Sequence, residues 1–302
     1  MSVIDLDFEP VVHNISTVHG ECPNHKAILH PETNNVLGIV GSKFRVISNP
    51  EVFDKVEGAI DNELPHQNYH VINHQSRGYA RTWREYVFPD IERQIKNDKH
   101  ETKLGFRIIV DNSFDGSGSN KVLFGAIDFF CTNGMIHGEF DVFKRVHKGS
   151  HEIPNMEGIL GQALAQYSNQ VTRYNIMANT LLKNSDALRF IEKILPNKQE
   201  DPDDPIGHMH SSTERIRLNR MGHKLYDQYT DEAQVRGNNL WSLYSAMTYF
   251  ASHDSERFGL SRSANDTHHE RLDRRNTRVN SWIKSDAWKT LIHGTNSQMV
   301  TA

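Results

Sequence analysis

Basic and aromatic side chains alternate along several apolar stretches of this chain, a combination that suits a single-stranded nucleic acid. Cations follow a phosphate backbone while aromatic rings stack on bases, at about 1–3 kcal/mol for each base, without a sequence code. In this interpretation the lysines and arginines hold phosphates, and Trp83 or Tyr86 stacks on bases. An ordinary solvated sheet face would carry similar residues and is the competing interpretation. The candidate contacts are Lys43, Arg45, Arg81, Trp83, Arg84, Tyr86, Lys103, Arg107, Lys144, Arg145 and Lys148.

Histidine-rich stretches offer a second chemistry, metal binding. The chain has 18 histidines; His208 and His210 are two residues apart, and His268 and His269 are adjacent. A metal site needs ligands in fixed geometry, commonly an i, i+4 pair on a helix with a distant ligand that completes it. These pairs have other spacings and fall in stretches that resemble loops. We therefore expect no metal and no other cofactor, and a metal-dependent hydrolase or nuclease is the alternative function.

Motifs of nucleophilic and phosphate chemistry are missing from the sequence. The glycine-rich run at 115–119 lacks a Gly-Lys-Ser/Thr ending and is more typical of a hairpin loop than of a phosphate-binding loop. The sequence contains no Gly-x-Ser-x-Gly and no His-Glu-x-x-His pattern. Its two cysteines, Cys22 and Cys131, fit reduced thiols of a cytoplasmic protein. These features favour a binding protein over an enzyme.

Composition predicts a folded chain without a membrane segment. Among 302 residues, 14 Phe, 9 Tyr and 4 Trp supply enough large apolar groups for a buried core. No apolar run reaches the roughly 18–20 residues of a membrane span, and the start lacks a secretion signal. We therefore expect a cytoplasmic protein with no membrane contact.

The charge distribution limits which nucleic-acid interaction is possible. The net charge is −4, and residues 1–70 hold 4 basic against 10 acidic residues. Such a chain can bind nucleic acid only through a basic strip on one face. The acidic N-terminal part is also compatible with a third function, an interaction protein that blocks a host-defence enzyme by resembling DNA.

The hydrophobic period changes along the chain and predicts four parts. Residues 1–35 predict an irregular arm, 36–196 an α+β core, 197–205 an acidic, proline-containing linker, and 206–302 a helical C-terminal subdomain. Within these parts we expect a hairpin at 36–48, a helix at 51–60, strands at 79–88, 103–110, 121–130 and 139–148, and helices at 160–181, 185–195 and 238–254.

The order of these elements predicts the fold class. Strands that follow one another in sequence form a largely antiparallel sheet. We expect an α+β fold, in which an antiparallel sheet of order β-α-β-β-β-β is covered by one long helix and followed by the helical subdomain.

Three stretches together resemble a family of phage- and plasmid-borne proteins of unknown function. They are LGIVGSKFRVISNPEVFD at 37–54, CTNGMI at 131–136 and NNLWSLYSAMTYFASHD at 238–254. The resemblance spans roughly residues 35–260 and implies a bacterial or phage origin and a cytoplasmic setting. It implies no catalytic residue.

The element order is also similar to that of phage single-strand annealing proteins. In those proteins a hairpin-rich sheet and a long helix form a positively charged groove, and the subunits assemble into rings or filaments. This similarity implies a non-enzymatic homo-oligomer that binds single-stranded DNA in recombination or replication.

Overall fold

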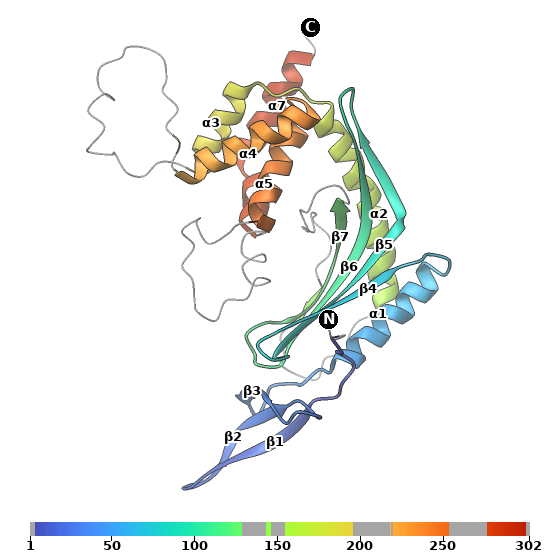
Figure 1. Ribbon diagram of the computed structural model, residues 1–302, viewed down its shortest axis with the longest axis vertical. Coiled ribbons are helices and arrows are strands. Elements are labelled where there is room, and N and C mark those ends of the chain that lie inside the picture. The colour runs from blue at the N-terminus through green and yellow to red at the C-terminus, as the bar shows by residue number, and fades with distance from the viewer. Residues whose placement is uncertain are drawn as a thin grey trace, which may run out of the picture. The chain divides into compact units, whose positions relative to one another are not determined.

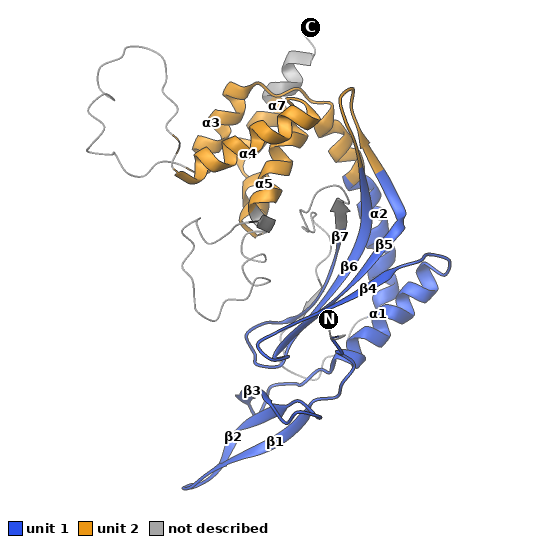
Figure 2. Cartoon of the chain, viewed as in Figure 1, with its two compact units in different colours: residues 1–93, 103–129, 136–170 blue, residues 94–102, 130–135, 171–302 orange. Residues whose placement is uncertain are grey.

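The computed structural model describes residues 4–128, 143–145, 155–195, 218, 220–253 and 277–299. The chain divides into two compact units, which Figure 2 shows in blue and orange. Unit 1 comprises residues 1–93, 103–129 and 136–170, and unit 2 comprises residues 94–102, 130–135 and 171–302.

Unit 1 begins with a three-stranded antiparallel sheet of order β1-β2-β3 (Figure 1). Its strands are β1 (Val11–Thr17), β2 (Gly20–Leu29) and β3 (Val36–Gly41). The prediction of an irregular arm over 1–35 is therefore wrong. The sequence did not reveal these strands because β1 and β2 are exposed over most of both faces and show no alternation of apolar and polar residues. The predicted hairpin at 36–48 is also wrong, since β3 pairs with β2.

Helix α1 (Asn49–Glu63) follows and confirms the predicted helix at 51–60. The Ser48 hydroxyl caps it by accepting a 3.2 Å hydrogen bond from the backbone N–H of Glu51, and Pro50 occupies the first turn, where its missing N–H costs nothing. The helix buries one apolar face, formed by Val52, Phe53, Val56, Ala59 and Ile60.

A buried amide joins α1 to the second sheet of unit 1. The Asn49 side chain donates to the Leu6 carbonyl at 3.0 Å and accepts hydrogen bonds from Thr82 Oγ1 at 2.9 Å and Asn112 Nδ2 at 3.0 Å. Buried polar groups must be paired in this way because an unpaired one costs about 1–3 kcal/mol. Asn49 thus fixes the N-terminal segment, the helix start and two strands against one another.

The second sheet has the order β4-β5-β6-β7-β8 and is antiparallel at the β4–β5, β6–β7 and β7–β8 pairs. Strands were expected in the regions of β5 to β8, but β4 was not, because its sequence HVINHQS is polar. β5 also continues beyond Pro89, where we expected it to end. The strands are β4 (His70–Ser76), β5 (Arg81–Lys96), β6 (Glu101–Ser113), β7 (Asn120–Asp128) and β8 (Phe143–Arg145).

Two helices cover one face of this sheet within unit 1 (Figure 1). Phe53 of α1 lies under the Arg84 guanidinium, whose central carbon is 3.9 Å from the ring centroid. Tyr167 of α2 (Met156–Ala178) contacts the Phe106 ring at 5.4 Å and donates a 2.9 Å hydrogen bond to the Leu104 carbonyl. Antiparallel sheets with helices on one face confirm the predicted α+β class.

Unit 2 is largely helical. It contains the end of α2, then α3 (Asn184–Ile194), α4 (Arg220–Arg236), α5 (Leu240–His253) and α7 (Asp286–Met299). The predicted helices at 160–181, 185–195 and 238–254 are confirmed, whereas α4 was not predicted. The predicted linker at 197–205 lies outside the described residues.

Candidate nucleic-acid interface

The β4–β5 register sorts the predicted contact residues of β5 onto opposite faces of the sheet. Cross-strand partners share a face, and neighbours along a strand alternate between faces. Arg81 and Trp83, which pair with Ser76 and His74, lie on the face away from α1 and α2. Arg84 and Tyr86 lie on the helix-covered face, as their contacts with α1 confirm. We call the face that carries Arg81 and Trp83 the polar face.

Arg84 and Tyr86 hold the fold together. Arg84 donates hydrogen bonds to Asp7 at 2.8 and 2.9 Å and to Glu57 at 3.0 Å, and the Tyr86 hydroxyl donates to Glu57 at 2.8 Å. Burial, together with the nearby Glu57 carboxylate, strongly raises the pKa of Tyr86. Tyr86 is fully buried and cannot stack on a base, and Arg84 is buried, so the predicted exposure of these two residues is corrected.

Arg81 and Arg107 lie on the polar face but are also buried, at 3% and 4% exposure. Arg81 makes a bidentate pair with Asp111, with Nη2–Oδ2 at 2.7 Å and Nε–Oδ1 at 3.2 Å. Arg107 Nη1 donates to Glu85 Oε2 at 3.0 Å. The prediction of a solvent-facing strip is corrected here as well. The sequence gives the charges along each strand, whereas these pairs form across strands.

A stacked aromatic pair lies beside these ion pairs. The His74 and Trp83 rings are 5.0 Å apart and nearly parallel, with 8° between their planes, and both residues are half-buried. His74 Nε2 lies 3.2 Å from Glu85 Oε1, so His74, Glu85 and Arg107 form a chain across three strands. Sequence reasoning identified Trp83 but missed His74, because only the strand pairing places them together.

The Glu85 carboxylate is stabilised in its charged form. Burial alone would raise the pKa of Glu85, but the hydrogen bond with His74 and the charge of Arg107 outweigh it and lower the pKa below the ordinary 4.5. A carboxylate with a lowered folded-state pKa stabilises the protein above its unfolded-state pKa and loses that contribution as the pH falls through the folded-state value.

We therefore expect Glu85→Gln to reduce the acid sensitivity of folding. The free energy of unfolding of the wild type should fall more between pH 6 and pH 3 than that of the variant, because the variant has no proton to gain at this position. Urea unfolding at both pH values measures the difference. Equal losses in the two proteins would show that Glu85 has the same pKa in the folded and unfolded states.

The register extends the polar face into a basic row. Lys121 is the cross-strand partner of Asp111, and Lys144 is the register partner of Lys121. Arg81 on β5 binds Asp111 on β6, so successive positions on β5 to β8 are occupied by Arg81, Asp111, Lys121 and Lys144. We call this set the basic row. Lys121 is buried at 8% exposure. Sequence reasoning missed Lys121, whose only signal was its place at the start of an apolar strand.

The remaining predicted contacts have separate surroundings. Lys103 on β6 is 42% exposed at its side chain and lies 3.0 Å from a glutamate of β5. Arg45 is paired at 2.8 Å with a glutamate of α1, and Lys43 is exposed in the turn after β3. Arg145 is the register partner of Asn120, and Lys148 lies outside the described residues.

Metal binding finds no support in the part of the chain that the structure describes. Within it, no group of three or more His, Cys, Asp or Glu side chains could hold a metal ion. The histidine-rich stretches at 208–210 and 268–270 lie outside the described residues.

None of the described helices combines the length and the apolar character that a membrane crossing requires.

The tryptophan-containing stretch at 238–254 builds a helix corner in unit 2. Gly237 ends α4 with a φ of +89°, a conformation that favours glycine. The Asn239 side chain then caps α5 by accepting a 2.9 Å hydrogen bond from the backbone N–H of Ser242. Trp241 and Tyr244 pack against Tyr174 of α2 at ring distances of 4.8 and 5.3 Å. This stretch therefore has a clear structural role.

Comparison with known proteins identifies a family. No curated protein and no solved structure matches the chain. A family model described as a domain of unknown function, DUF932, matches residues 36–279, which is most of the chain. The match confirms the expected membership in a family of unknown function. The chain therefore belongs to the DUF932 family.

Proposed function

We propose that this protein binds single-stranded DNA through the polar face of the β4–β8 sheet. It would do so without catalysis, as a homo-oligomer that promotes strand annealing in phage or plasmid recombination or replication in a bacterial cytoplasm. One observation supports the proposal most: the half-buried, stacked His74–Trp83 pair lies on the same face of the sheet as the basic row.

This juxtaposition fits the chemistry of a single strand. Trp83 follows Arg81 by two residues on β5, so the two occupy the same face about 7 Å apart along the strand. A base that stacks on the indole would therefore bring its phosphate near the basic row. The basic row gathers lysine and arginine on one face, which an acidic chain needs in order to bind nucleic acid.

Element order supports the annealing part of the proposal. A strand–helix unit, an antiparallel sheet and a long helix follow one another here as they do in phage single-strand annealing proteins.

Binding to a labelled strand of about 40 nucleotides, followed by fluorescence anisotropy, tests the proposal. With three or four phosphate contacts, we expect the affinity to fall about 20- to 50-fold between 50 and 200 mM salt. Trp83→Ala should weaken binding about 5- to 150-fold, and Trp83→Phe should retain part of it because the phenyl ring still stacks. Lys144→Ala, which removes one charge from the basic row, should reduce the salt slope by about 0.7.

Lys55→Ala is the matched control, because Lys55 is exposed on α1, which covers the opposite face of the sheet. It removes the same charge and should leave the affinity and the salt slope unchanged. Absence of binding at 50 mM salt would contradict the proposal. So would a Trp83→Ala variant that is folded by circular dichroism and binds as tightly as the wild type.

A further inference from the structure

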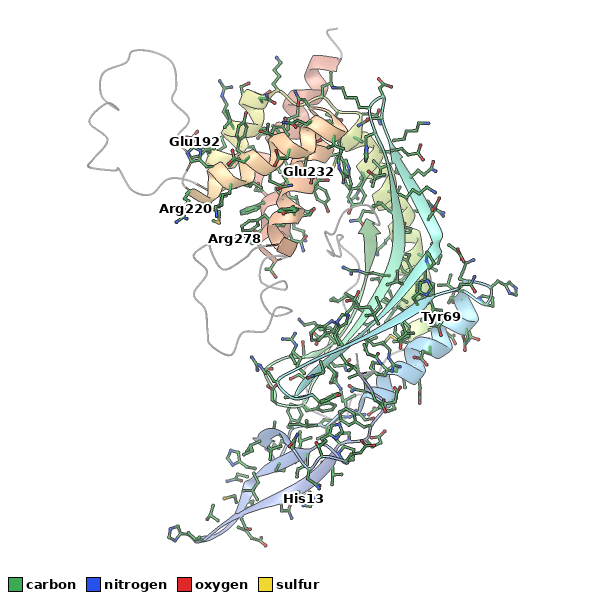
Figure 3. The ribbon with its side chains drawn as sticks, in the orientation of Figure 1. His13, Tyr69, Glu192, Arg220, Glu232 and Arg278 are labelled. Carbon is green, nitrogen blue, oxygen red and sulfur yellow. The ribbon has the colours of Figure 1, made fainter. Side chains whose placement is uncertain are left out.

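The β1–β3 sheet carries an apolar cluster on its outer face. Its register forms two rows across the three strands, Val11–Leu29–Val36 and His13–Ala27–Ile39. Because cross-strand partners share a face, five aliphatic side chains and one imidazole form a contiguous patch. Figure 3 labels His13 on β1.

The opposite face of the same sheet is the one that packs in unit 1. Ile28 and Val40 are buried there in a cluster with Phe8, Leu37 and Phe114. On the outer face, by contrast, Val11 is 41%, Val36 58% and Ile39 63% exposed. Single exposed apolar residues are ordinary, whereas these aliphatic side chains adjoin one another on one face.

We propose that the outer face of the β1–β3 sheet binds the same face of a second copy of this chain. A two-fold interface places each residue against the same surface of the partner, so a charged patch would repel its copy. The six positions of the two rows contain no Lys, Arg, Asp or Glu. This face can therefore meet its own copy without charge repulsion, and sheets stack face to face about 10 Å apart.

Charge also argues against two other occupants. Residues 11–41 contain one lysine and two glutamates, so the sheet attracts neither a nucleic acid nor an anionic membrane. The inference rests on the proposed function only in naming the surface through which the homo-oligomer forms, since the proposed DNA site lies on the β4–β8 sheet.

Size-exclusion chromatography with light scattering tests this interface between 5 and 100 μM protein. We expect the wild type to have a mass of at least twice the 34.7 kDa of one chain. Ile39→Lys should halve that mass, because it places two like charges in the apolar interface. Val18→Lys is the matched control: Val18 is 96% exposed in the β1–β2 turn, outside the two rows, and its variant should keep the wild-type mass.

A monomeric wild type at 100 μM would overturn the inference, as would an Ile39→Lys variant with the wild-type mass. A monomeric wild type that instead floats with phosphatidylcholine vesicles would also overturn it and identify lipid as the occupant. The DNA titration separates this inference from the proposed function. Loss of DNA binding in Trp83→Ala with the oligomer mass intact supports two separate surfaces. A wild type that oligomerises as expected but binds no DNA would contradict only the proposed function.

Discussion

Replacing Asp111 by asparagine should lower the free energy of unfolding by about 3–5 kcal/mol. Asp111 is fully buried, and its two oxygens accept hydrogen bonds from the Arg81 guanidinium. The variant keeps the size of the side chain but removes the negative charge that the buried Arg81 guanidinium binds. Urea unfolding at neutral pH measures the loss.

The matched control replaces both members of the pair. Arg81→Met combined with Asp111→Leu removes both charges of the pair, so neither Arg81 nor Asp111 is buried without the other. We expect the double variant to be more stable than Asp111→Asn, because apolar replacements of a buried ion pair are often tolerated. A loss below about 1 kcal/mol in Asp111→Asn would show that other groups or water compensate Arg81.

Gly38→Ala should destabilise unit 1 by about 3 kcal/mol, near the upper end for overpacking. A Cβ at Gly38 would lie 2.6 Å from both the Phe114 carbonyl oxygen and the Asp115 Cα. Both obstacles are backbone atoms, so no side chain can rotate away and β3 must move from the loop that follows β6. The midpoint of thermal or urea unfolding measures the change.

Gly58→Ala is the control for this prediction. Gly58 lies in α1, and a Cβ there would meet no atom within 4 Å. Alanine also favours the helix, so this variant should gain about 0.5–1 kcal/mol. A Gly38→Ala variant as stable as the wild type would contradict the close approach of β3 to the loop that follows β6.

Local signals explain which parts of the fold could be predicted. Ser48 and Pro50 mark the start of α1, and apolar residues at helical spacing from Leu160 to Ala178 mark α2; neither signal depends on distant residues. β1 and β2 have no such signal. They are exposed on most of both faces, so the alternation that identifies a half-buried strand is absent.

The candidate site was only partly predictable for a related reason. The sequence indicated that basic residues and Trp83 lie close together, but not that Arg81 and Arg84 lie on opposite faces or that each has an acidic partner on another element. His74 and Lys121 join the site through strand register alone. Register depends on long-range pairing and on the exact ends of each strand, which sequence patterns locate poorly.

Photocrosslinking locates the bound strand most directly. A single strand that contains 5-bromouracil crosslinks on irradiation to aromatic side chains stacked on the base, and mass spectrometry identifies the attached peptide. We expect crosslinks to the β5 peptide that contains Trp83, and their loss in Trp83→Ala. Crosslinks confined to α1 or to the helices of unit 2, with none on β5, would contradict the assignment of the polar face as the DNA-binding surface.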